Sequence, residues 1–122
     1  MNNYQKLAMR TNDHLSTNRF IDGIAKYYEV DLHQLMNGCL GLSGEVGEFN
    51  DEIKKALYHD KPMDKNHLQK ELGDVLWYIA LICDAFDWNM NDIMRMNVQK
   101  LQERYPEGFD TERSNNRKEN DI

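Results

Sequence analysis

The sequence lacks what several large classes of protein need. It has only 2 prolines and 7 glycines in 122 residues, fewer than a turn-rich all-β sandwich uses. Its 2 cysteines are too few for a disulfide scaffold, and reduced thiols favour a cytoplasmic protein. Residues 1–6 contain no apolar stretch of the kind that marks an export signal. The most apolar run, residues 75–83, is about half the roughly 20 residues that span a bilayer, so we expect no membrane partner.

Basic residues are also scarce. Lys and Arg number 15 against 21 Asp and Glu, which gives a formal net charge of −6. A protein that binds a nucleic-acid polymer usually carries an excess of positive charge, so we expect no partner of this class. Hydrophobic residues make up 40% of the chain, which is enough for one core, and the length predicts a single domain.

Hydrophobic periodicity predicts an all-α chain of four main helices joined by short loops. The segments with helical spacing are residues 4–11, 20–28, 32–59, 65–86 and a last one that ends near residue 104. Asp31, Asp64 and Asn91 can cap the last three helices. Polar residues at 11–13 and 16–18 indicate breaks in the N-terminal part.

The pattern favours a four-helix bundle-like domain at residues 1–109, followed by a polar and mobile tail at 110–122. Residues 72–83 are apolar nearly all round the helix, which favours burial against a second subunit over a central place in a monomer. Four glycines in the 32–59 helix indicate that another helix or a ligand approaches its backbone. One apolar stripe on that helix is formed by Leu35, Cys39, Leu42, Val46, Phe49, Ile53, Ala56 and Leu57.

Two acidic pairs carry the most chemical information. Glu45 and Glu48 are three residues apart on one predicted helix, and Glu71 and Asp74 have the same spacing on the next. Each pair therefore shares a helical face beside an apolar stripe. Antiparallel packing of the two helices can bring the four carboxylates together, where they would repel unless protons or a cation neutralised them. Ordinary solvated helix acids are the alternative interpretation.

An open, oxygen-rich cluster favours Mg²⁺ shared with a phosphorylated substrate. The last predicted helix adds Asn97, Lys100 and Arg104 on one face. Lys and Arg there can bind phosphate oxygens, and a solvated helix face is an equally good explanation of the spacing. Lys55 follows the first acidic pair and falls near its face.

Three segments, in order, resemble the MazG-like superfamily of all-α nucleoside triphosphate pyrophosphohydrolases. They are residues 41–48 (GLSGEVGE), 71–78 (ELGDVLWY) and 97–109 (NVQKLQERYPEGF). The first two match the family signature E-x-x-E, a spacer and E-x-x-D, with residues 49–70 as the spacer. The likeness covers about residues 35–109, whereas residues 12–34 match nothing recognised.

The resemblance implies cleavage of a nucleoside triphosphate to the monophosphate and pyrophosphate by a homodimer or homotetramer with sites near subunit contacts. It implies Mg²⁺, with Mn²⁺ as a substitute, bound by Glu45, Glu48, Glu71 and Asp74. Glu48, together with Glu45, is the candidate that orients or deprotonates a water molecule. Tyr78 is a candidate for contact with the sugar or base. The other candidate substrate-binding residues are Lys55, Asn97, Lys100, Arg104 and Tyr105.

Two other interpretations stay open. His59 and Asp60, with His33 upstream, fit the start of an HD-type metal phosphohydrolase motif. A non-catalytic acidic helical dimer that binds a partner protein would leave the acidic pairs as solvated surface. Cys39 and Cys83 are not expected to act as nucleophiles, because both lie on apolar helical stripes where buried cysteines are common.

Overall fold

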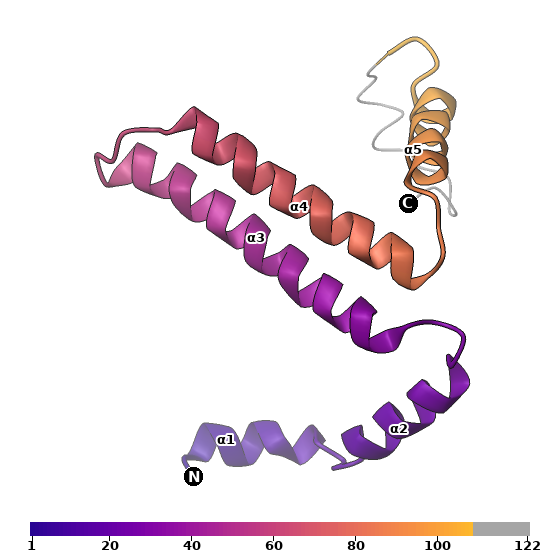
Figure 1. Cartoon of the computed structure of the whole chain (residues 1–122). Helices are drawn as coiled ribbons and strands as arrows, with labels where there is room; N and C mark the ends of the chain where they lie inside the picture. The colour runs from indigo at the N-terminus through magenta and orange to yellow at the C-terminus, as the bar shows by residue number, and fades with distance from the viewer. Residues whose placement is uncertain (109–122) are drawn as a thin grey trace.

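The computed structural model describes residues 1–108, and helices are the only regular elements in this range (Figure 1). They are α1 (Asn3–Ala8), the short 3-10 helix η1 (Met9–Thr11), α2 (Ser16–Lys26), α3 (Leu32–Tyr58), α4 (Lys65–Ala85) and α5 (Met90–Arg104). The prediction of an all-α chain is confirmed. The tail predicted at residues 110–122 lies outside the described residues.

Capping side chains fix the starts of the long helices. Asp31 accepts a hydrogen bond from the backbone N–H of Gln34 at 3.1 Å and so begins α3, as predicted. Asp64 does the same for α4, with the N–H of His67 at 3.0 Å. The cap predicted for α5 is wrong by two residues, because Asn89 accepts from the N–H of Asn91 and the helix begins earlier.

The break predicted at residues 16–18 is also wrong, because these residues form the first turn of α2. Ser, Thr and Asn favour caps and turns, but the first helical turn accepts them as well. The real break lies just before, where Asp13 accepts a hydrogen bond from the N–H of Leu15 at 3.0 Å and forms an ion pair with Arg19. α2 therefore begins three residues after the predicted first break.

Helices α3 and α4 pack antiparallel along their length, and this is the main tertiary contact in the part of the chain that the structure describes (Figure 1). The 59–64 loop joins them at one end. α2 and α5 both leave the opposite end and run away from the pair in different directions (Figure 1). The Gln34 side chain ties that end together, because its Nε2 donates to the Leu81 carbonyl at 3.0 Å and to Asp84 at 2.8 Å.

The core of the single chain is small, because α3 has one extensive neighbour. Cys83 and Ala85 are the buried hydrophobic residues among those described. The stripe predicted on α3 is only partly correct: Leu35, Leu42, Phe49, Ile53 and Ala56 are half-buried, whereas Cys39, Val46 and Leu57 are exposed. The burial expected for Cys83 is confirmed and that expected for Cys39 is wrong. Across residues 1–108, no helix combines the length and the hydropathy needed to cross a membrane.

Candidate metal centre

Two glycines set the close approach of α3 and α4. A Cβ placed at Gly41 would lie 2.1 Å from the Tyr78 ring, and one at Gly38 would lie 2.6 Å from the Ile82 side chain. These helices can therefore pack at this distance only because both positions lack a side chain. The glycines predicted that another helix or a ligand approaches the backbone of α3. This prediction is confirmed at Gly38 and Gly41, where α4 is the approaching helix. Gly44 and Gly47 instead face open space within 4 Å.

The same packing brings carboxylates of both helices together. One oxygen from each of Glu45, Glu71 and Asp74 can be chosen so that all three lie within 4.8 Å of one another. Glu45 is one turn beyond Gly41 on α3, and the two acids of α4 precede Tyr78. The structure thus joins the two acidic pairs through three of their four members. Glu48 is exposed and stands outside this group of three.

Burial makes this group unlike ordinary helix acids. Glu71 is only 9% exposed, and Glu45 is half-buried. One oxygen of each, Oε2, is buried and finds no hydrogen-bond partner among the described residues. Leaving a buried carboxylate oxygen without a partner is costly, which favours a ligand in contact with it.

The electrostatics point in the same direction. Burial, contact with Glu71 and the charges of Glu48 and Asp74 raise the pKa of Glu45 to about 7. The glutamate therefore binds a proton that an exposed glutamate would release near pH 4.5. A cation at this place would stabilise the charged form and remove the repulsion.

The donor set fits a hard divalent cation. All three groups are carboxylates, which suit Mg²⁺ and Mn²⁺, whereas Zn²⁺ sites usually include histidine or cysteine. The group leaves room for water or substrate ligands, which Mg²⁺ commonly keeps. These donors therefore match a metal shared with a phosphorylated ligand better than a closed structural site.

The comparison with known families agrees with this geometry. The model of the MazG nucleotide pyrophosphohydrolase domain matches residues 34–109, which include both acidic pairs and α5. The chain belongs to the MazG family. Members of this family generally use a divalent metal, and the three converging carboxylates are a group within residues 1–108 of this MazG chain that could hold one.

A curated relative extends the comparison. "Gene 37 protein" of Mycobacterium phage L5 is 38% identical over 74 residues, which cover 57% of this chain and 64% of that protein. The MazG chain thus matches slightly less than two thirds of this relative's length. No solved structure gives a significant match.

The predicted phosphate-binding residues lie on α5 or directly after it, apart from the carboxylates. Asn97 is exposed, and Lys100, Arg104 and Tyr105 are half-buried. The Arg104 guanidinium stands 5.9 Å from the centre of the Tyr105 ring. α5 leaves the end of α4 and packs along neither α3 nor α4 in the described chain (Figure 1). One chain therefore does not bring this set to the metal centre.

The other two predicted substrate-binding residues have contacts within the α3–α4 pair. Lys55 Nζ lies 2.9 Å from Asp51 Oδ2, and this hydrogen bond raises the pKa of Lys55. Tyr78 lays its ring over Gly41 and meets the Trp77 ring edge-on at 5.1 Å. Much of the Tyr78 ring thus serves helix packing.

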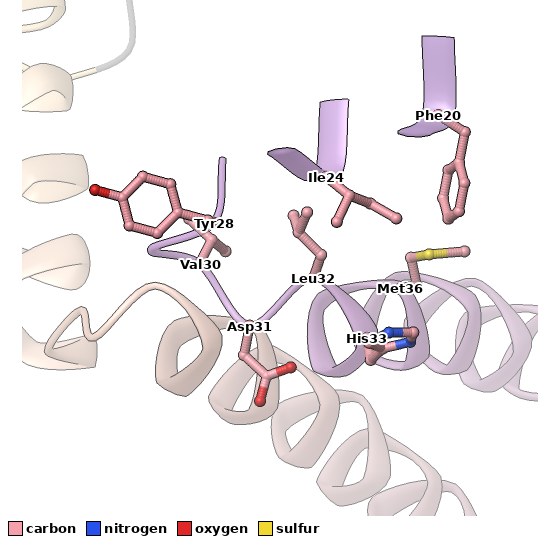
Figure 2. A pocket seen from close by; sticks show the side chains of 8 residues that line it. All are labelled: Phe20, Ile24, Tyr28, Val30, Asp31, Leu32, His33 and Met36. Atoms are coloured by element: carbon pink, nitrogen blue, oxygen red, sulfur yellow. The ribbon is translucent and has the colours of Figure 1, made fainter. Parts of the chain in front are cut away.

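The HD-type alternative gains no metal cluster. His59 follows the end of α3, and Asp60 has a positive φ of 56° in the loop. Over residues 1–108, the only group of three or more potential ligands close enough to hold a metal is the carboxylate group, and it contains no histidine. His33 instead lines an apolar pocket of about 240 Å³ between α2 and the start of α3, with Phe20, Leu32 and Met36 (Figure 2).

Sequence reasoning missed a polar set beside Glu71. His67 Nε2 lies 3.1 Å from Glu71 Oε1. Lys61 Nζ contacts both carboxylate oxygens of Glu52, at 3.2 and 2.9 Å. The spacing of four residues between His67 and Glu71 was the available signal, since such pairs meet on a helix.

Proposed function

We propose that this MazG protein is a Mg²⁺-dependent pyrophosphohydrolase that cleaves a nucleoside triphosphate to the monophosphate and pyrophosphate. The observation that carries the proposal is the convergence of Glu45, Glu71 and Asp74 on one place, with two buried oxygens lacking partners among the described residues. The family match supports the reaction class. Mn²⁺ is the expected substitute for Mg²⁺, because it accepts the same oxygen ligands.

The candidate residues have different roles in the proposed reaction. Glu45, Glu71 and Asp74 bind the cation, and Glu48 completes the set from the exposed side of α3. When bound, the cation supplies positive charge to the phosphate oxygens and acidifies a water ligand. Glu48, assisted by Glu45, accepts a proton from the attacking water or orients it. Asn97, Lys100, Arg104 and Tyr105 bind phosphates, Lys55 contacts the substrate, and Tyr78 contacts the sugar or base.

The active species in this proposal is a homodimer or homotetramer. Large apolar side chains on α4 support it: Leu76 is 57% exposed and Trp77 is 58% exposed in the single chain. Covering them with a second copy would bury apolar surface that water otherwise contacts. A second copy can also supply the α5 residues that one chain holds away from its carboxylates. A cytoplasmic location stays a prediction.

The test is pyrophosphate release from a panel of nucleoside triphosphates with Mg²⁺, compared between wild type, Glu71→Gln and Glu48→Gln. Glu71→Gln should lower turnover by at least about 100-fold and weaken metal binding, because it removes a charged ligand. Glu48→Gln should lower turnover strongly with a smaller loss of metal binding. Both variants should keep the wild-type helical circular dichroism. Full turnover in both would disprove the site.

The alternative functions give different results in the same assay. If the protein is an HD-type enzyme, His59→Ala should abolish its activity. If the carboxylates carry the reaction, His59→Ala should keep wild-type activity. A non-catalytic partner-binding dimer would bind neither Mg²⁺ nor a non-hydrolysable triphosphate in isothermal titration.

A further inference from the structure

The surroundings of Glu71 contain a side chain that the proposed mechanism does not use. His67 stands one turn before Glu71 on α4, in the first turn of the helix. The backbone N–H of His67 donates a hydrogen bond to Oδ1 of the capping residue Asp64 at 3.0 Å. Its Nε2 reaches Oε1 of Glu71 at 3.1 Å. The other oxygen of Glu71, Oε2, is buried without a partner among the described residues.

We propose that His67 is a positioning residue, which donates a hydrogen bond to Oε1 of Glu71 and so keeps Oε2 available for the divalent cation. This inference rests on the metal site of the proposed function and goes beyond its list of ligands. It also explains why the two oxygens of one carboxylate have different environments.

The physical need for such a contact is clear. A glutamate side chain has three rotatable bonds, and the carboxylates of Glu45 and Asp74 repel that of Glu71 in the absence of a cation. A hydrogen bond to one oxygen restricts the rotation and fixes the direction of the other oxygen. The neutral imidazole with its proton on Nε2 and the protonated imidazole both donate from this atom, so the role does not depend on the charge of His67.

The burial of the two partners separates this contact from an ordinary surface pair. The His67 side chain is 46% exposed, whereas that of Glu71 is 11% exposed. Exposed pairs with this spacing usually contribute little to stability. Here the carboxylate of Glu71 is held inside the helix pair, and a partly exposed imidazole lies 3.1 Å from one of its oxygens.

A second ion pair lies next to His67. The hydrogen bond from Lys61 holds the pKa of Glu52 below its usual range, and the charge of His67 contributes to this lowering. Glu52 on α3 and His67 on α4 therefore interact electrostatically across the helix pair. Since Lys61 belongs to the 59–64 loop, this pair fixes the loop end of the helix pair near the histidine.

The experiment compares metal binding in wild type, His67→Ala and His67→Gln, with His59→Ala as a matched control. His59 is an exposed histidine of the same hairpin that does not contact the carboxylates. Free Mn²⁺ is measured by electron paramagnetic resonance during titration, without nucleotide. Loss of a residue that orients a metal ligand typically weakens metal binding 10- to 100-fold, so we expect at least about a tenfold loss in His67→Ala.

His67→Gln should recover most of the affinity, because its amide N–H can occupy the position of Nε2. His59→Ala should bind Mn²⁺ like wild type. Circular dichroism should be the same for all four proteins, because the exposed side chain of His67 adds little to the fold. Wild-type affinity in His67→Ala would overturn the proposal, and so would a glutamine variant as weak as the alanine variant.

The readout distinguishes this inference from the proposed function. If wild type binds Mn²⁺ but releases no pyrophosphate from any nucleotide, the proposed reaction fails while the positioning role is still decided by the variants. If wild type binds no Mn²⁺, both fail. If hydrolysis is normal and the His67 variants bind metal equally well, only the positioning role fails.

Discussion

Helices α3 and α4 bring three carboxylates together within one chain, whereas α5 carries its predicted phosphate-binding residues without packing along that pair (Figure 1). Both regions have polar residues at helical spacing beside apolar ones. The difference is that α3 and α4 have each other as partners. The packing of α3 against α4 brings acidic residues that are spaced along the two helices into a cluster of three carboxylates.

A single chain defines only part of the candidate site. The candidate cation ligands are brought together by contacts inside the chain, because Gly41 and Tyr78 fix the helix pair one turn away from Glu45. The face of α5 with Val98 and Leu101 remains substantially exposed at 53% and 43%. Metal binding should therefore be a property of the α3–α4 pair, and triphosphate binding a property of the assembled oligomer.

The largest effect that separates the two regions should come from the double variant Lys100→Gln, Arg104→Gln. Each charge-assisted hydrogen bond to a phosphate contributes about 1.5–3 kcal/mol, so their joint loss should raise KM at least about tenfold. Mn²⁺ affinity without nucleotide should not change, since α5 lies outside the carboxylate group. Steady-state kinetics and Mn²⁺ titration on the same preparation measure the two effects. A loss of metal binding would show that α5 supports the metal centre directly.

Mixing the two kinds of variant tests whether two subunits share one site. Glu71→Gln protein lacks a metal ligand, and the α5 double variant lacks cations. If one subunit supplies α5 to the carboxylates of another, mixed oligomers contain some complete sites. Their activity should then exceed that of either variant alone. Activity that stays at the level of the separate variants, after exchange of subunits is verified, would argue for sites built from one chain.

A smaller effect is expected from alanine at two glycines of α3. Gly41→Ala should destabilise the protein by about 1–3 kcal/mol, because the new Cβ meets the Tyr78 ring at 2.1 Å and overpacks the helix contact. Gly47→Ala should stabilise it by about 0.5–1 kcal/mol, because the position faces open space and alanine favours a helix. Urea unfolding gives both values. Equal effects at the two positions would contradict the helix packing described here.

Much of this fold was predictable because local signals were strong. The caps Asp31 and Asp64 and the periodicity placed α3 and α4 within one residue of their observed ends. Burial was harder to predict, because periodicity shows which face is apolar but not whether a neighbour covers it. Val46 and Leu57 share the stripe of Phe49 and are nevertheless exposed in the single chain.

The candidate site was also predictable only in part. Spacing placed Glu45 with Glu48, and Glu71 with Asp74. It did not distinguish Glu45, which meets the other helix, from Glu48, which faces outward. Residues three apart differ by roughly 60° around a helix, and only the angle at which two helices pack decides which one points inward. The acidic spacing did not indicate His67, because a histidine belongs to neither acidic pair.

The last predicted effect concerns pH and the proton on Glu45. Its pKa is about 7 in the folded protein against an ordinary value of 4.5, so the metal-free folded state keeps a proton that the unfolded state has lost. This contribution to the free energy of unfolding is full below about pH 4.5 and disappears as the pH rises to about 7. Asp51 and Glu52, whose ion pairs lower their pKa values, act in the opposite direction at lower pH. The difference between wild type and Glu45→Gln isolates the Glu45 proton, because both proteins share the other groups.

In urea titrations with chelator, wild type should lose stability relative to the variant between pH 5 and about 7. Added Mg²⁺ should reverse this loss in wild type above pH 7, since the cation replaces the proton at the carboxylates. A difference that does not vary with pH would show that Glu45 keeps an ordinary pKa, and the repulsion that we assign to the carboxylate group would then be absent.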